Sequence, residues 1–555
     1  MSNSKANGGK KSSTAIIFVA VFILGVLVMA IICLLGAKLL MKPKTLDQLA
    51  GKVKTTTADK VMGQISIGDT SLYDELPEIS KYSKAVTGQG DVDIEIFTSG
   101  EKAGTDTDSW LIVAAEEFND SDYKLSDGSS VSISVRSVAS GLAADYIISG
   151  KYYPDLYTPS NTLFGEYAIA NNASLTIAEE RLVGNTAGIL VKKDSSYETA
   201  EDVLAAVSSG EISLGFTNPQ TSATGLNMLL TVMKSADGSV SSDAAIDAFT
   251  SFNEHIPYIA TTTQQMRDSA SNGTLDAMVS EYQAYINNKN LVSIYKFIPF
   301  GARHDNPLYV VNRGEKTENE LEAIDMICEF LTSDSIQEIA TKDGFNAYDE
   351  YASAIEVSGA EVTEALTVYK ANKDNGQDII AVFVADCSGS MSGAPINELK
   401  ESLINGCNYI NSTNYIGLVS YSSDVTIELP IDRFNTTQQS YFIGATNRLT
   451  ANGTTSTYEA VCVAAKMVEE ALEEHPDAKP MIFVLSDGYA NGNYKLSGIT
   501  SAIQDTEIPV YTIAYGDDAD TEQLKELSNI NEAASISADV DDVVYQIKVL
   551  FNSTL

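Results

Sequence analysis

Apolar and polar positions divide the chain into one long apolar segment and two alternating series. Residues 14–37 carry only apolar or small side chains, with lysines before and after them. At ~1.5 Å per residue, a helix of this length spans roughly 36 Å, enough to cross the apolar core of a bilayer with some tilt. Because a cleaved signal peptide has a shorter apolar core, we expect an uncleaved transmembrane anchor behind a short cytoplasmic tail at 1–13.

The first alternating series follows a polar stretch. Residues 38–90 are polar and interrupted by proline and glycine, which indicates a stalk or linker. From residue 91 to about residue 355, strand-like stretches such as DVDIEIF and VSISVRSV alternate with helix-like stretches such as DSWLIVAAEEF. This alternation predicts an α/β fold with a parallel sheet.

The second series begins after a linker predicted at 356–376. Its strands, which include DIIAVFVAD and PMIFVLSD, are short and rich in valine and isoleucine, and a last helix is expected near 539–551. Such strands are typical of a sheet that is buried on both faces. We therefore predict a second α/β domain at 377–555.

Charge and cysteine content exclude several classes of protein. The formal net charge is −39, and a surface this acidic repels nucleic acid, so we expect no nucleic-acid partner. The five cysteines include no CxxC pair, which argues against a disulfide framework or a zinc site. With three histidines, no nucleophile–base set and no phosphate-binding loop, the chain is not expected to be an enzyme.

Three segments of the second domain place oxygen-bearing side chains at strand ends. Asp386, Ser388 and Ser390 stand at the end of one strand, NGTTSTYEA at 452–460 is a loop that enters a helix, and LSDGYANG at 485–492 ends another strand. Because strand carboxyl ends meet at one edge of a doubly wound sheet, these side chains should converge. Hydroxyl and carboxylate oxygens suit Mg²⁺ or Mn²⁺ rather than zinc. A cation with so few charged ligands would accept one more acidic oxygen from outside.

The order DCSGS, GTTSTYEA and LSDG resembles the von Willebrand factor A (VWA) domain with its metal-ion-dependent adhesion site, over about residues 377–555. The resemblance implies a doubly wound, Rossmann-like fold in which Ser388, Ser390 and Thr455 bind the metal directly. It also implies that Asp386 and Asp487 act directly or through water, and that an acidic protein partner completes the coordination. A degenerate domain that binds no metal is the alternative.

The first domain resembles type II solute-binding proteins of bacterial ABC importers, over about residues 91–355. The segments that carry this resemblance are FTSGEKAGT, RSVASGLAADYIISG, GFTNPQTSATGLNML and MRDSASNGTLDAMVSEYQAY. It implies two lobes, joined by crossings near 184–187 and 285–305, that close on a ligand by a hinge motion. Free N–H groups and hydroxyls at helix starts suit an oxygen-rich or anionic solute.

Six residues are candidates for the cleft between the lobes, although each could instead be a helix cap, a turn residue or a core tyrosine. They are Ser99, Gly100, Ser140, Thr221, Thr224 and Tyr282. Trp110, the only tryptophan, is expected in the core on its helix.

The combined expectation is a single-pass protein of a bacterial cell membrane with its bulk outside the cytoplasm. The metal-dependent domain would bind a protein partner, and the bilobal domain would bind or sense a solute. One alternative is an accessory receptor of an ABC importer. Another is a cytoplasmic-facing adaptor, because lysines flank the anchor on both sides and the positive-inside rule does not decide the orientation.

Overall fold

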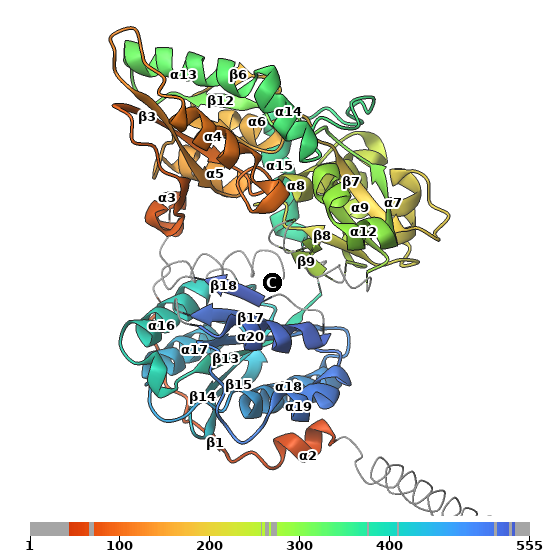
Figure 1. The fold of residues 1–555 in the computed structure, drawn as a ribbon. Coiled ribbons are helices and arrows are strands. Elements are labelled where there is room, and N and C mark those ends of the chain that lie inside the picture. The colour runs from red at the N-terminus through yellow and green to blue at the C-terminus, as the bar shows by residue number, and fades with distance from the viewer. Residues whose placement is uncertain are drawn as a thin grey trace, which may run out of the picture.

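The chain folds into two α/β units joined by short connections (Figure 1). The computed structural model describes residues 44–65, 71–256, 258–260, 263, 266–267, 275–373, 377–407, 410–515, 519–531 and 535–538. The expected anchor at 14–37 and the expected helix near 539–551 lie outside these residues. Within the part described, no helix has the length and apolar character needed to span a bilayer.

The first unit consists of two lobes, each built on its own sheet. The sheet of the first lobe has the order β2-β4-β3-β5-β12-β6, in which β3 pairs in parallel with β4 and β5 and the outer strands pair antiparallel. Its strands are β2 (Lys84–Val86), β3 (Val92–Thr98), β4 (Val131–Ser137), β5 (Leu156–Thr158), β6 (Leu175–Glu179) and β12 (Leu308–Val311). Its helices are α3 (Leu72–Glu75), α4 (Trp110–Asp120), α5 (Ser140–Ser149), α6 (Thr162–Ala170), α13 (Glu318–Leu331) and α14 (Asp334–Lys342). Trp110 is fully buried on α4, as predicted, and its indole N–H donates to the Ile336 carbonyl at 3.0 Å.

The second lobe has a five-stranded sheet in the order β11-β7-β10-β8-β9. Its strands are β7 (Ala187–Lys192), β8 (Leu214–Thr217), β9 (Tyr258–Ala260), β10 (Ala277–Glu281) and β11 (Tyr295–Pro299). Its helices are α7 (Ala200–Ser208), α8 (Ala223–Asp237), α9 (Asp243–Asn253), α11 (Tyr282–Asn287) and α12 (Lys289–Ile294). The chain crosses between the lobes before β7 and after β11, and the crossings run side by side through a bridge between Asn185 and His304. The bilobal arrangement expected from the sequence is therefore present.

The second unit is a seven-stranded sheet in the order β1-β15-β14-β13-β16-β17-β18, parallel except where β14 meets β15. Its strands are β1 (Thr55–Thr57), β13 (Ile379–Asp386), β14 (Tyr415–Tyr421), β15 (Val425–Arg433), β16 (Lys479–Ser486), β17 (Val510–Tyr515) and β18 (Ser535–Ala538). Its helices are α2 (Leu46–Ala50), α16 (Ala394–Gly406), α17 (Thr436–Arg448), α18 (Thr457–Glu474), α19 (Leu496–Gln504) and α20 (Thr521–Ser528).

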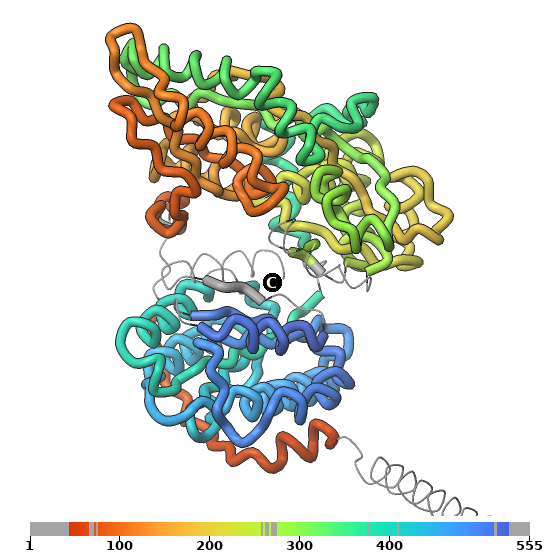
Figure 2. The backbone as a smooth tube through the Cα atoms, viewed as in Figure 1, coloured from red at the N-terminus to blue at the C-terminus, as the bar shows by residue number. Residues whose placement is uncertain are grey.

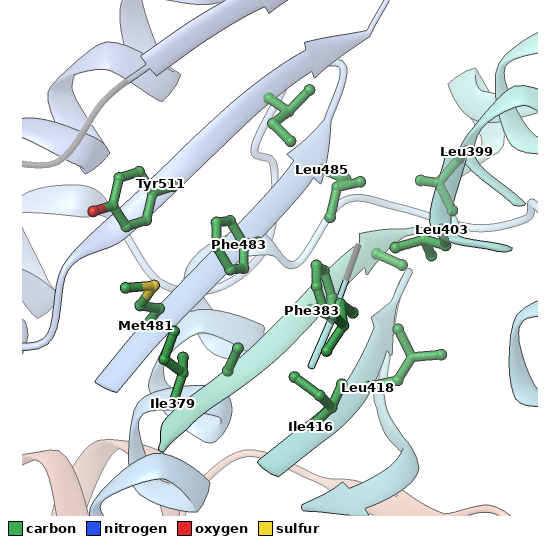
Figure 3. Close-up of a cluster of buried hydrophobic side chains, with 14 of the residues drawn as sticks. Ile379, Phe383, Leu399, Leu403, Ile416, Leu418, Met481, Phe483, Leu485 and Tyr511 are labelled. Atoms are coloured by element: carbon green, nitrogen blue, oxygen red, sulfur yellow. The ribbon is translucent and has the colours of Figure 1, made fainter. Parts of the chain in front are cut away.

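Alternation along β13 buries both faces of this sheet. Phe383 faces α16 and stacks on Phe483 of β16, with 5.2 Å between ring centroids (Figure 3). The neighbouring Val382 and Val384 belong to the core on the opposite face, under α18 and α19. Successive strand residues point to opposite faces, so a strand in which every residue is apolar requires helices on both sides. This confirms the doubly wound arrangement.

The expected stalk at 38–90 is wrong where the structure describes it. Residues 44–65 pack on the second unit, and in Figure 2 this red segment lies against the blue part of the chain. Leu46 and Leu49 of α2 are buried in its core, and β1 adds a parallel edge strand to β15. All three residues of β1 are exposed. The pairing therefore rests on backbone hydrogen bonds, which leave no apolar pattern in the sequence.

The rest of the expected stalk and the expected linker at 356–376 belong mostly to the first unit. Strand β2 pairs with β4, and Leu76 lies in the core of the first lobe. Helix α15 (Gly359–Asn372) begins with a capping box formed by Ser358 and Glu361. Its buried Val362 and Tyr369 join the same core as Leu76. The chain therefore passes between the units twice, at 66–70 and at 374–376, and the first unit is inserted into the second.

Candidate functional site

Two loops of the second unit meet at the carboxyl end of β13. The Gly389 N–H donates to the Gly453 carbonyl at 3.1 Å, and the Asn452 N–H donates to the Cys387 carbonyl at 2.7 Å. Gly453 has φ +77°, a conformation that glycine adopts at little cost. The turn after β13 and the loop before α18 are thus fixed against each other, as the sequence predicted.

Asp386 lies at the base of this site and is fully buried. Its Oδ1 accepts from the Ser388 N–H at 2.8 Å. Its Oδ2 accepts from the hydroxyls of Ser486 and Tyr421, at 2.6 Å and 3.0 Å. Burial raises the pKa of Asp386, and the nearby charge of Asp487 adds to the increase. A cation beside Asp386 would oppose both effects, because it favours the charged form of the carboxylate.

Ser388 lies next to this carboxylate, and Ser390 and Thr455 belong to the turn and the loop that meet there. The Ser388 and Ser390 Oγ atoms are 3.0 Å apart; Ser388 is buried and Ser390 is exposed. Thr455 is also buried, and Asn491 holds its backbone: the Thr455 N–H donates to Asn491 Oδ1 at 2.8 Å, and the Asn491 N–H donates to the Thr455 carbonyl at 2.9 Å. We refer to the turn at 386–390 and the adjoining loop at 452–455 as the cradle; its polar side chains range from the buried carboxylate of Asp386 to the exposed hydroxyl of Ser390.

Sequence reasoning missed the residues that orient this cradle. Tyr421 ends β14, Ser486 ends β16, and Asn491 lies in the loop after β16. Ser486 stands in the quoted LSDG segment, but neither Tyr421 nor Asn491 belongs to a motif with a chemical signal. Among the described residues, no group of three or more His, Cys, Asp and Glu side chains could hold a metal ion; the predicted set instead combines two carboxylates with three hydroxyls.

Cys387 lies between the predicted ligands but faces the core. It is 5% exposed, and burial raises the pKa of its thiol to about 12. It is a packed thiol.

The first unit has a cavity of about 200 Å³ between its lobes. It lies at the carboxyl ends of β3, β4 and β10 and at the starts of α5 and α8. Four of the six predicted cleft residues line it, namely Ser99, Gly100, Ser140 and Thr221. The two lobes meet beside it, where Arg267 pairs with Asp108 at 2.7 Å and the Gly141 N–H donates to the Thr221 carbonyl at 3.0 Å.

The other two predicted cleft residues are not part of the cavity lining. Thr224 is fully buried behind the wall, where its hydroxyl donates to Glu281 Oε1. Tyr282 packs in an aromatic cluster, with ring centroids 4.6 Å from Tyr348 and 5.2 Å from Phe297. Thr224 therefore supports the wall, and Tyr282 is a packing residue.

A buried ion pair lies beside Ser99. Lys102 is fully buried. Its Nζ is 3.0 Å from Glu101 Oε1 and donates to Ser99 Oγ and Asn306 Oδ1, both at 2.6 Å. Burial favours neutral Glu101, but Lys102 and the Ser99 hydroxyl outweigh it and lower the pKa of Glu101 to about 2. Both residues stand in the quoted FTSGEKAGT segment, yet that segment does not show that they are buried together.

Glu281 supplies a second carboxylate to the cavity wall and is 2% exposed. Its Oε2 has no hydrogen-bond partner among the described residues. Burial, together with the charge of Glu101, raises the pKa of Glu281 to about 7. The nearby His304 is neutral, because burial lowers its pKa to about 4. No motif in the sequence marks Glu281 as a cleft group.

Comparison with known proteins matches both units to families. A model described as bacterial extracellular solute-binding protein matches residues 104–346, and a model described as von Willebrand factor type A domain matches residues 381–548. Inter-alpha-trypsin inhibitor heavy chain H3 of Bos taurus is 27% identical over 158 residues, which are 26% of this chain. The match spans 17% of the length of that relative.

Solved structures resemble each unit separately. The von Willebrand factor type A protein from Catenulispora acidiphila is 18% identical, covers 32% of this chain and 42% of that chain, and has a TM-score of 0.30. The sulfate-binding protein SubI from Mycobacterium tuberculosis H37Rv is 17% identical, covers 50% and 91%, and has a TM-score of 0.35. A periplasmic thiamin binding protein is 13% identical, covers 51% and 95%, and has a TM-score of 0.39.

Proposed function

Because the chain combines a bacterial extracellular solute-binding domain with a von Willebrand factor type A domain, we propose that it is a membrane-anchored bacterial surface protein that couples cation-dependent protein recognition to small-ligand binding. The observation that carries this proposal is the cradle, where the turn that holds Asp386, Ser388 and Ser390 is hydrogen-bonded to the loop that holds Thr455.

The residues present fit a divalent cation. Ser388, Ser390 and Thr455 offer neutral oxygens that would hold Mg²⁺ or Mn²⁺ directly. The carboxylate of Asp386 already accepts three hydrogen bonds, so it would act on the ion through water or through the Ser388 hydroxyl. Asp487 is partly exposed and would contribute the second negative charge. A bound cation supplies a Lewis-acidic position that accepts one further oxygen.

An acidic side chain of a protein partner would provide that further oxygen. Ser390 is exposed, so a partner carboxylate can approach the ion from the solvent side. Carboxylate oxygens are the protein ligands that hard divalent cations prefer. Recognition would therefore require both the cation and an Asp or Glu of the partner.

The cavity between the lobes supports the second part of the proposal. It is lined by residues of both lobes, so a ligand bound there would hold the lobes together. Because the first unit is inserted into the second, a change in lobe arrangement would act on the second unit at both ends of the insertion.

Calorimetric titration of Mg²⁺ and Mn²⁺ into the full chain, purified in detergent, tests the metal site. We expect one-to-one binding that Asp386→Ala abolishes and that Ser390→Ala weakens by at least ~10-fold, because loss of even a supporting group usually costs this much. Ser392→Ala is the matched control: Ser392 is an exposed serine of the same turn but not a predicted ligand. Equal affinity in the two serine variants would remove Ser390 from the site.

Protease accessibility on intact cells tests the orientation. Cleavage of the second unit by external protease is expected if the bulk of the chain lies outside. Protection in intact cells and cleavage after lysis would instead support the cytoplasmic-facing adaptor.

A further inference from the structure

Among the described residues, the charged side chains around the cleft form ion pairs with one another, with the exception of Glu281. Glu101 is paired with Lys102 at 3.0 Å, and Arg267 is paired with Asp108 at 2.7 Å. Glu281 lines the cavity and is 2% exposed. Its Oε1 accepts a hydrogen bond from the Thr224 hydroxyl. Its Oε2 has no partner among the described residues. One carboxylate thus remains without a paired cation at the cavity wall.

His304 does not supply the missing charge. Its Nε2 lies 3.0 Å from Asn161 Nδ2 and 3.4 Å from Asn227 Nδ2. The Asn227 Oδ1 accepts from the Ala302 N–H at 2.8 Å, which identifies Asn227 Nδ2 as a donor, so His304 Nε2 is an acceptor and the ring proton is on Nδ1. That Nδ1 is 3.7 Å from Glu281 Oε1, beyond hydrogen-bond distance. Burial also lowers the pKa of His304 to about 4, so the ring is neutral near pH 7.

Three groups that could serve an anion already have partners within the protein. The Ser222 hydroxyl caps the start of α8 by accepting from the Gly225 N–H at 3.3 Å. The Gly141 N–H, at the start of α5, donates to the Thr221 carbonyl. The Ser99 hydroxyl donates to Glu101 at 2.6 Å. An oxyanion in this cavity would face two carboxylates and would compete for donors that have partners.

We propose that the cleft binds a small organic ligand with a positively charged amine, and that Glu281 provides its counter-charge. This inference rests on the proposed function in one respect, namely that the cleft binds a ligand. It differs from the expectation from the sequence in the charge of that ligand, which the sequence suggested to be an oxygen-rich or anionic solute. A cavity of about 200 Å³ has room for several non-hydrogen atoms, because one water needs only ~10–15 Å³ of such volume. A bare ion would leave most of it empty.

The pH dependence of binding has a definite sign. Burial and the charge of Glu101 raise the pKa of Glu281 to about 7, while Thr224 and Arg267 oppose the increase; His304 faces it as a neutral ring. An amine binds to the deprotonated carboxylate and displaces its proton, so affinity should increase as pH rises through about 7. An anion would bind better to the protonated form and should show the opposite trend.

Calorimetry on the full chain tests the proposal with four probes: putrescine and ethanolamine as amines, and sulfate and molybdate as oxyanions. We expect at least one amine to bind, with tighter binding at about pH 8 than at about pH 6. Glu281→Gln should weaken this binding about 10- to 100-fold, since it removes a charge-assisted hydrogen bond. Glu211→Gln should leave it unchanged, because Glu211 is an exposed glutamate of the same lobe that accepts from the Tyr197 hydroxyl.

The Gln variant should fold, because it removes an unpaired buried charge rather than one member of a pair, and its melting curve checks this. Tighter binding of sulfate or molybdate than of both amines would overturn the charge class and leave ligand binding by the cleft intact. Equal amine affinity in Glu281→Gln would overturn the role of Glu281. No binding of any probe at about 10 mM would overturn this inference and the ligand-binding half of the proposed function together, without affecting the metal titration.

Discussion

If the cradle binds a metal, loss of the hydroxyl should impair metal binding at one of two adjacent threonines and not at the other. Thr455 is 3% exposed, and its backbone is held by Asn491. Thr454 is exposed, and its hydroxyl lies 3.1 Å from Ser423 Oγ. Valine preserves the branched shape of threonine and removes the hydroxyl. Thr455→Val and Thr454→Val therefore differ in which hydroxyl is lost, and we expect only the first to impair metal binding.

The magnitude follows from linkage between binding and folding. A cation at 100 times its dissociation constant stabilises the unit that binds it by about 2.7 kcal/mol. For a unit of roughly 180 residues, each kcal/mol changes the melting temperature by about 2–4 °C, so the metal should raise it by roughly 5–11 °C. If Thr455→Val weakens binding ~100-fold, the same metal concentration gives only about 0.4 kcal/mol, and the increase falls to roughly 1–2 °C.

Differential scanning calorimetry of the full chain, with Mg²⁺ or with EDTA, measures this difference. Two transitions are expected from two units, and only the transition of the second unit should depend on metal. Wild type and Thr454→Val should show the full increase, and Thr455→Val should not. An equal metal-induced increase in both variants would show that Thr455 is not a ligand, and a wild-type chain that does not respond to Mg²⁺ or Mn²⁺ would refute the metal site.

Three further predictions concern stability. Leu49→Ala should lower the unfolding free energy of the second unit by about 2–5 kcal/mol, because Leu49 is 1% exposed in that unit's core. Lys52→Ala, at an exposed neighbour, should have little effect. Equal denaturation curves for the two variants would show that α2 does not pack on the second unit. Lys102→Met should destabilise the first unit by about 3–5 kcal/mol by leaving Glu101 buried without its cation, whereas the double change Glu101→Gln/Lys102→Met should recover much of the loss in chemical denaturation. The pKa of Glu281 is raised from 4.5 to about 7 in the folded state, so between these pH values the folded state binds more protons than the unfolded state. The stability that Glu281 contributes therefore falls as pH rises from about 4.5 to 7. The unfolding free energy of Glu281→Gln relative to wild type should rise over the same range, and a difference independent of pH would contradict the raised pKa.

Periodicity in the sequence was sufficient for elements that bury a continuous apolar face. The loop that contains Thr455 was predicted to enter a helix, and α18 follows it at Thr457–Glu474. The stretch DIIAVFVAD was predicted as a strand, and all residues of β13 are buried. In both cases the buried residues are apolar, and they recur at the spacing of the helix or strand that carries them. The local sequence pattern therefore predicts the same element that packing on the sheet requires.

The same reasoning failed where an element depends on backbone pairing or on a few apolar residues. Strand β1 has three exposed threonines, and helix α2 buries only Leu46 and Leu49. Neither shows a period long enough to recognise. Helix α15 has buried residues at Val362, Ala365, Leu366 and Tyr369, but it was read as part of a linker because its polar surroundings obscured this spacing.

The sequence by itself determined the two-unit α/β architecture and the order of the hydroxyl- and carboxylate-bearing segments around Asp386, because strand ends in such sheets meet at one edge. Only the tertiary structure decided that the segment before the first unit belongs to the second, and which charges around the cleft have partners. Glu101 and Lys102 are neighbours in the sequence, but only the fold buries them together beside Asn306 and leaves Glu281 of the other lobe without a paired cation among the described residues. Burial sets the desolvation energy of these groups and their distances set the Coulomb energy, and the sequence shows neither.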